Sequence, residues 1–79
     1  MDNIELDIQK IMADVFETTV DTITLDSTQD SVENWDSLKH LDLVVSIEEK
    51  FMITIPIEEV GDLVSFKLIS VIVKEQLAS

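Results

Sequence analysis

The chain has 79 residues, among them no cysteine, no arginine and no tyrosine, and only one glycine and one proline. Without cysteine it can form neither a disulfide framework nor a cysteine metal site, and any thiol chemistry needs a thiol from outside the sequence. No apolar run approaches the roughly 18 residues of a membrane span, and the acidic N-terminal segment is unlike a signal peptide. We therefore expect a cytoplasmic protein without membrane insertion.

Positive charge is scarce as well, because five lysines stand against seventeen acidic residues and the formal net charge is −12. Such a charge argues against binding of nucleic acid or of an anionic membrane surface, and it predicts partners with basic patches. The length and the hydrophobic content of 46% suit one small domain over residues 1–79 with a single core. We expect this domain to be a monomer.

Apolar residues at helical spacing predict three main helices. The first is expected over residues 2–17, after a capping box made by Asp2 and Glu5. The second opens at Asp36-Ser37 and runs to Phe51, and a last helix is capped by Ser65. The positions assigned to the core are Ile4, Ile8, Ile11, Met12, Val15 and Phe16, then Leu38, Leu41, Val44, Val45, Ile47, Phe51 and Met52, and finally Phe66, Ile69, Ile72, Val73 and Leu77.

The remaining segments predict loops and one short helix. Residues 18–34 lose the helical period and form a long loop, which needs apolar anchors on the helices. Residues 53–56 are expected to be extended, and Pro56 can start a short turn that Gly61 ends. The predicted fold is all-α: a small bundle of three main helices plus one short helix, with a long loop between the first two. The expected loop anchors are Val20, Ile23, Leu25, Val32 and Trp35.

The segment around Ser37 contains residue types found in two kinds of site. Asp36, Ser37 and His40 could supply a hydrolytic triad, but no GxSxG turn is present and a small bundle has little room for a water-excluding pocket. The acids of residues 26–37 suggest a calcium loop, yet Ser31 and Ser37 replace its glycine and its last glutamate. We predict neither an enzyme nor a metal site, and we interpret His40 as a partly buried helix residue.

Ser37 has two interpretations. On local pattern alone it is an ordinary N-cap of the second helix. As an attachment site, its position at a helix N-terminus would stabilise an anionic group such as a phosphodiester on its oxygen. Asp42 and Glu49 lie two turns apart on the same helix, where they can guide a basic enzyme towards the serine, although such acids are also common on a merely solvated face.

A series of short motifs resembles the acyl carrier protein family over essentially the whole chain. The motifs are Asp36-Ser37-Leu38, Leu41-Asp42-Leu43, Glu48-Glu49, Phe51, Ile55-Pro56 and Glu58-Glu59. The resemblance implies that a phosphopantetheinyl transferase attaches a 4'-phosphopantetheine arm from coenzyme A to Ser37, between Asp36 and Leu38. It also implies that the thiol of the arm carries acyl groups as thioesters and presents them to biosynthetic enzymes of a fatty acid, polyketide or other specialised pathway.

The same resemblance implies a recognition surface. Acidic residues would face basic patches on the transferase and on acyl-transferring and acyl-modifying enzymes, and apolar residues would border a place where an acyl chain shelters between helices. The acids are Asp36, Asp42, Glu48, Glu49 and Glu58, and the apolar residues are Leu38, Val45, Ile57 and Val60.

Departures from the family pattern favour a specialised carrier. Asn34-Trp35 stands where many members have a glycine, and Lys39 and Lys50 interrupt the acidic helix. These lysines change the charges that enzymes of general fatty acid synthesis would recognise. The alternative to a carrier is an unmodified acidic helical adaptor that binds a basic protein partner through the same helix.

Overall fold

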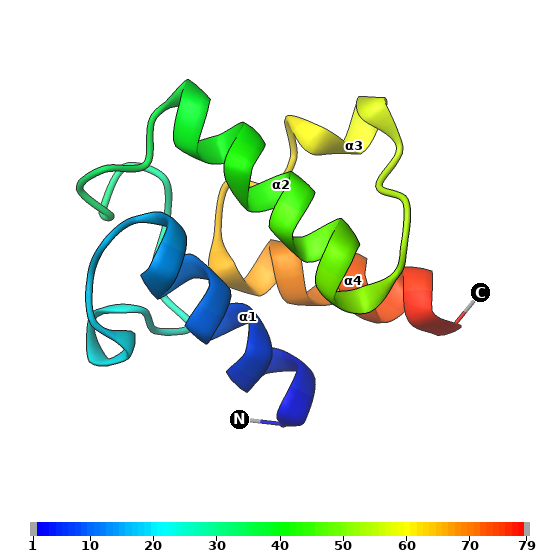
Figure 1. Cartoon of the computed structure of the whole chain (residues 1–79), viewed down its shortest axis with the longest axis horizontal. Helices are drawn as coiled ribbons and strands as arrows, with labels where there is room; N and C mark the ends of the chain where they lie inside the picture. Colours follow the sequence, from blue (N-terminus) through cyan, green and yellow to red (C-terminus); the bar gives the residue numbers. More distant parts are fainter. Residues whose placement is uncertain (1, 79) are drawn as a thin grey trace.

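The computed structural model describes residues 2–78, and these residues form four α-helices and no strand. The helices are α1 (Asn3–Val15), α2 (Ser37–Phe51), α3 (Ile57–Val60) and α4 (Phe66–Ala78), and a 3₁₀ turn, η1 (Val20–Thr22), lies in the first loop. α1 packs against both α2 and α4, and α2 lies between α1 and α3 in the view of Figure 1. The predicted bundle of three main helices and one short helix is confirmed. No helix in this part of the chain has the length and apolar character needed to cross a membrane.

α1 begins at the predicted capping box. The side chain of Asp2 accepts a hydrogen bond from the backbone N–H of Glu5 at 2.8 Å, and the Glu5 side chain accepts one from the Asp2 N–H at 3.0 Å. The helix ends at Val15, earlier than the predicted residue 17. Glu17 has a φ of 56°, a left-handed conformation that cannot continue a right-handed helix.

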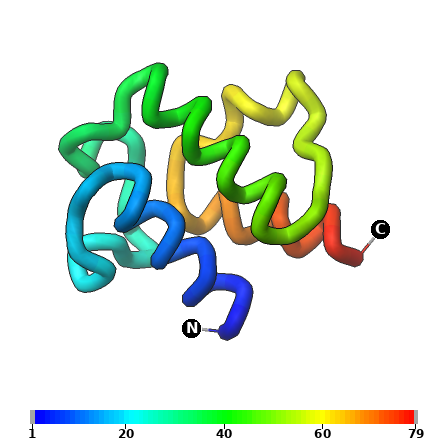
Figure 2. The backbone as a smooth tube through the Cα atoms, viewed as in Figure 1, coloured from blue at the N-terminus to red at the C-terminus, as the bar shows by residue number. Residues whose placement is uncertain are grey.

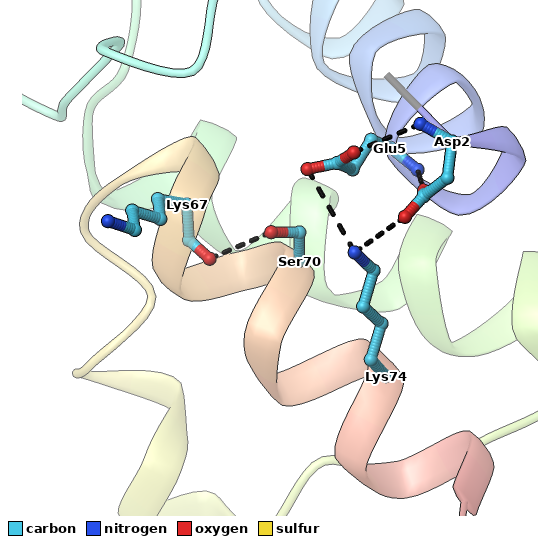
Figure 3. Close-up of polar contacts among 5 residues, drawn as sticks. All are labelled: Asp2, Glu5, Lys67, Ser70 and Lys74. Atoms are coloured by element: carbon cyan, nitrogen blue, oxygen red, sulfur yellow. Dashed lines mark hydrogen bonds and ion pairs between the residues drawn. The ribbon is translucent and has the colours of Figure 1, made fainter.

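The charged end of α1 is tied to α4 (Figure 3). Lys74 Nζ lies 2.6 Å from Asp2 Oδ2 and 4.0 Å from Glu5 Oε2. The hydrogen bond from Lys74, followed by the one from the Glu5 backbone, lowers the pKa of Asp2. The same bond with Asp2 raises the pKa of Lys74.

The core draws on one face of each long helix. The α1 stripe is confirmed, since Ile8, Met12 and Phe16 are buried and the other predicted members pack against them. α4 contributes buried side chains as predicted, except that Leu77 is exposed because the last turn extends beyond the elements that cover the helix. The buried residues of α4 that were predicted are Phe66, Ile69, Ile72 and Val73.

α2 buries only part of the face that was predicted: Val44 and Ile47 are buried as expected, and Phe51 packs partly against the core. Its buried residues are Leu43, Val44 and Ile47, and Leu43 was not among the predicted core positions. Four side chains that were assigned to the core lie in solvent: Leu38 (75% exposed), Leu41 (57%), Val45 (52%) and, just after the helix, Met52 (91%). These four assignments were wrong because apolar residues cover more of the α2 surface than the rest of the fold buries.

Side-chain hydrogen bonds hold the long first loop against α1 and the residue that follows it. Gln9 Nε2 donates hydrogen bonds to the carbonyls of Val20 and Ile23, at 2.8 and 2.7 Å. Asn34 Nδ2 donates to the Phe16 carbonyl at 2.9 Å. Figure 2 follows this loop around one end of the molecule, beside α1.

Three of the five predicted loop anchors are confirmed. Ile23, Val32 and Trp35 are buried, whereas Val20 and Leu25 are exposed. The two exposed residues lie in tight turns whose backbone is fixed by hydrogen bonds, so their side chains are not needed to hold the loop.

The middle of the loop pairs with the segment that starts α4. Thr28 and Ser65 form an isolated antiparallel bridge, and the backbone N–H of Phe66 donates to the carbonyl of Ser27 at 3.0 Å. Ser65 Oγ accepts a hydrogen bond from the Leu68 N–H at 3.1 Å, which confirms the predicted cap of the last helix.

Candidate functional site

Asp36 caps the N-terminus of α2. Its backbone is extended, with φ −101° and ψ −174°, and its side chain accepts a hydrogen bond from the backbone N–H of Lys39 at 2.9 Å. Its carbonyl accepts the first hydrogen bond of the helix, from the His40 N–H at 2.8 Å. Ser37 is therefore the first residue of the helix, and its interpretation as an ordinary N-cap is wrong.

Ser37 has an exposed hydroxyl at this helix end. The residue is solvent-accessible, and its side chain makes no hydrogen bond among residues 2–78. The backbone N–H groups of Ser37 and Leu38 precede the first helical hydrogen bond and have no acceptor within the described chain. The site thus combines an accessible nucleophilic oxygen with unpaired donors at the positive end of a helix dipole.

The residues of the rejected triad are engaged elsewhere. His40 Nδ1 accepts a hydrogen bond from the indole N–H of Trp35 at 3.0 Å, and His40 Nε2 lies 2.8 Å from the carbonyl oxygen of Val60. With both ring nitrogens in use, His40 is not placed to take a proton from Ser37. As expected, His40 is half-buried and Trp35 is buried.

An exposed apolar stripe follows Ser37 along α2. Leu38, Leu41 and Val45 are spaced so that they lie on one side of the helix, and all three are more than half exposed. We call these three residues the α2 stripe. Ile57, on α3, is also 88% exposed. Exposed apolar residues arranged in this way favour contact with another molecule.

Acidic side chains flank the α2 stripe. Asp42 follows Leu38 by one helical turn and Glu49 follows Val45 by one turn, and both are exposed. Glu58 on α3 is exposed as well. A partner that buries the α2 stripe would therefore meet negative charge at its edges.

Glu48 has a structural role that the sequence did not reveal. Its Oε2 accepts a hydrogen bond from the backbone N–H of Ile55 at 2.9 Å, and the side chain is half-buried. This bond holds the segment between α2 and α3 against the end of α2. The two residues are seven positions apart across a helix end, where no spacing rule links them.

The residues expected to border a carried acyl chain lie mostly on the surface. Leu38, Val45 and Ile57 are exposed, and only Val60 packs partly against the core. A cleft of about 250 Å³ lies elsewhere, between the end of α1 and the first loop, and its lining is about equally polar and apolar. Within residues 2–78, no group of three or more histidine or acidic side chains is placed to hold a metal ion.

No protein family model matches the sequence, and no curated protein matches it significantly. The case for a function therefore rests on the geometry around Ser37 and on the motifs that resemble acyl carrier proteins.

Proposed function

We propose that the chain is a non-catalytic carrier protein in which Ser37 holds a 4'-phosphopantetheine arm. One observation carries the proposal: Asp36 caps α2 through the Lys39 N–H, so the exposed Ser37 hydroxyl is not needed for the fold. The motifs around Ser37 support the same function, and the departures at Lys39 and Lys50 support a specialised pathway. We propose that this pathway is cytoplasmic.

The residues at the site fit the group. When attached, the arm supplies the thiol that this cysteine-free chain lacks, and acyl groups are carried there as thioesters. Its phosphate, bound to Ser37 Oγ, is an anion that the unpaired N–H groups of Ser37 and Leu38 can stabilise.

The attachment step needs a base from another protein. Ser37 Oγ attacks the phosphorus next to the pantetheine of coenzyme A, a new O–P bond forms, the phosphoanhydride P–O bond to the nucleotide breaks, and adenosine 3',5'-bisphosphate leaves. The hydroxyl proton must pass to a base of the transferase, because both nitrogens of His40 are engaged by Trp35 and Val60. The carrier itself therefore contributes an accessible oxygen and a docking surface.

The α2 stripe and its acids are the proposed docking surface. A basic enzyme with an apolar centre can bury Leu38 and Leu41 while its cations approach Asp42. The surface is small, which suits partners that must release the carrier after each step.

Loading in vitro tests the proposal. The purified chain is incubated with coenzyme A and a phosphopantetheinyl transferase of broad specificity, and its intact mass is measured. The expected result is the addition of one arm to the wild type and to Ser46→Ala, a half-buried serine on the same helix, but none to Ser37→Ala. Absence of loading in the wild type, or loading of Ser37→Ala, would contradict the proposal.

A second candidate is the unmodified acidic adaptor, which the exposed α2 stripe also favours because the stripe is present without any arm. An adaptor would take up no arm, and it would bind a basic partner equally well after Ser37→Ala. A carrier is loaded, and its unloaded Ser37→Ala variant fails to support acyl transfer. The loading experiment therefore separates the two.

A further inference from the structure

A chain of side-chain contacts joins the segment before α2 to the end of α3. The indole Nε1 of Trp35 donates to His40 Nδ1 at 3.0 Å, and His40 Nε2 lies 2.8 Å from the Val60 carbonyl oxygen. An indole N–H can only donate, so Nδ1 must be the unprotonated acceptor. The ring is therefore neutral with its proton on Nε2, which donates to Val60.

Trp35 supports this chain of hydrogen bonds from the core. Its side chain is 5% exposed and stacks on Phe16, with ring centroids 4.9 Å apart and an interplanar angle of 30°. The ring of His40 lies nearly parallel to the indole, at 6.1 Å and 22°. Phe16 is buried in the core just after α1. The imidazole of His40 is therefore held in place by Trp35, which is itself held by Phe16.

α3 has few contacts of its own. It has four residues, its N-cap Pro56 makes no side-chain capping bond, and none of its side chains is fully buried. So short a helix is not stable in isolation. Its place depends on the buried residues Ile55 and Leu63 on either side, and on the Val60 carbonyl, which accepts from His40 and, at 3.3 Å, from the Leu63 N–H.

His40 lies one helical turn after Ser37, so its bond to Val60 connects the modified end of α2 to α3. α3 carries two exposed residues, Ile57 and Glu58, of the kind that a basic enzyme with an apolar centre would contact. We propose that His40 is a positioning residue: in its Nε2–H form it fastens α3 to the serine end of α2, so that a basic partner enzyme meets Leu38 and Ile57 in a fixed arrangement. The part of this proposal that concerns the partner rests on the proposed carrier function.

The tautomer can be measured directly, because the chain has a single histidine and a single tryptophan. Nitrogen-15 NMR of the wild-type imidazole at neutral pH should show a protonated Nε2, a bare Nδ1 and a hydrogen bond to the Trp35 indole. A ring that is protonated on Nδ1 would overturn the proposal without any variant.

Two variants then test the two hydrogen bonds of His40 separately. In His40→Gln the amide nitrogen can reach the place of Nε2 and keep the bond to Val60, whereas in His40→Asn the amide oxygen can replace Nδ1 and keep only the bond to Trp35. We expect the backbone amide resonances of α3 to stay near their wild-type values in His40→Gln and to shift in His40→Asn. Unchanged α3 resonances in His40→Asn would overturn the positioning role.

Loading kinetics test the consequence for the partner. The KM of the chain for a phosphopantetheinyl transferase should rise roughly tenfold in His40→Asn, the scale expected for one lost hydrogen bond, with kcat unchanged because Ser37 is intact. In His40→Gln the KM should stay within about twofold of the wild type. Equal KM values for the two variants would contradict the proposal.

The outcomes separate this inference from the carrier function. If the wild type is not loaded, the carrier function fails, and the tautomer and the α3 resonances still decide whether His40 holds α3. If the wild type is loaded but His40→Asn is loaded with the same KM, the carrier function stands and the positioning role is wrong. Should His40→Asn fail to fold, Trp35→Phe provides the second test: it keeps a buried ring but removes the donor that holds Nδ1 unprotonated, so the share of the Nε2–H form should fall and the α3 amide resonances should shift. Unchanged α3 resonances in a Trp35→Phe variant whose tautomer has changed would contradict the proposal.

Discussion

The side chain of Asp36 accepts a hydrogen bond from the backbone N–H of Lys39 at 2.9 Å, and this bond caps α2 without any contribution from Ser37. Two neighbouring residues thus have separate tasks. Asp36 stabilises the start of the helix, and Ser37 presents an exposed hydroxyl beside unpaired backbone donors. The start of α2 therefore does not depend on the Ser37 hydroxyl, which stays accessible to other molecules.

The division of tasks predicts that two neighbouring substitutions have unequal effects on stability. Asp36→Ala should lower the free energy of unfolding by about 1 kcal/mol, the usual value of a lost N-cap. Ser37→Ala should change it by less than about 0.5 kcal/mol, because an exposed side chain without hydrogen bonds is replaced. Urea unfolding, monitored by circular dichroism, measures the free energy of unfolding of both variants. A loss in Ser37→Ala as large as that in Asp36→Ala would show that the serine is the structural cap.

The ion pair between Asp2 and Lys74 predicts a pH dependence. The lowered pKa of Asp2 means that its contribution to stability is present above the unfolded pKa, near 4, and is lost as the pH falls through the folded value. The raised pKa of Lys74 means that its contribution is complete below about pH 10 and is lost as the pH rises through the folded value.

The difference in melting temperature between the wild type and Lys74→Gln should therefore be constant between about pH 5 and pH 9 and shrink at both extremes. The matched control is Lys67→Gln, an exposed lysine of α4 that makes no ion pair in the described chain. Because Asp2 and Lys74 are both solvent-accessible, the effect should be small. A difference for Lys67→Gln with the same pH profile would argue that only net charge matters.

Glu59 carries a buried oxygen, Oε2, that has no hydrogen-bond partner among the described residues, whereas Glu58 beside it is exposed. An apolar side chain of similar length would remove the unpaired buried oxygen, so Glu59→Met should raise the free energy of unfolding by about 1 kcal/mol. Glu58→Met changes the net charge equally and should have less than half of this effect. Thermal unfolding compares the two, and equal shifts would indicate general repulsion in place of a local cost.

The net charge of −12 predicts that salt stabilises the fold. Screening should reduce repulsion among the excess acids and raise the melting temperature as sodium chloride increases from about 0.01 M to 0.5 M. Chloride is preferred to sulfate because sulfate also strengthens apolar burial. The ion pairs of Lys74 with Asp2 and of Lys39 with Glu17 are weakened at the same time, but exposed pairs contribute little. A melting temperature that stays level or falls across the series would count against the prediction.

Features that depend on residues within one helical turn could be predicted from the sequence. The capping box of Asp2 and Glu5, the Ser65 cap and the end of α3 before Gly61 are all present. In each case the side chain and the backbone group it serves are fixed by the local chain. Helix number and order followed from these signals and from the apolar spacing.

The buried side of α2 could be predicted only in part. Leu41 and Leu43 are equally apolar and differ in position by two residues, yet only Leu43 is in the core. Which side is covered depends on where α1 and α4 lie, and the pattern of α2 alone does not contain that information. The same limit hid the α2 stripe, because apolar residues that contact a partner are indistinguishable in sequence from those that contact the core.

Parts of the candidate site were equally hidden. The sequence placed Ser37 at the start of a helix, but Asp36 and Ser37 are both good caps, and only the backbone geometry shows that Asp36 takes the role. The bridge from His40 to Val60 joins residues twenty positions apart. No local spacing connects an imidazole with a distant carbonyl.

The central claim is that Ser37 bears a phosphopantetheine arm, and mass spectrometry of the protein purified from its native host tests it most directly. The carrier account predicts a population heavier than the polypeptide by one arm, with fragment ions that assign the added mass to Ser37. Finding only the unmodified polypeptide, in cells where a known carrier protein bears its arm, would contradict the account.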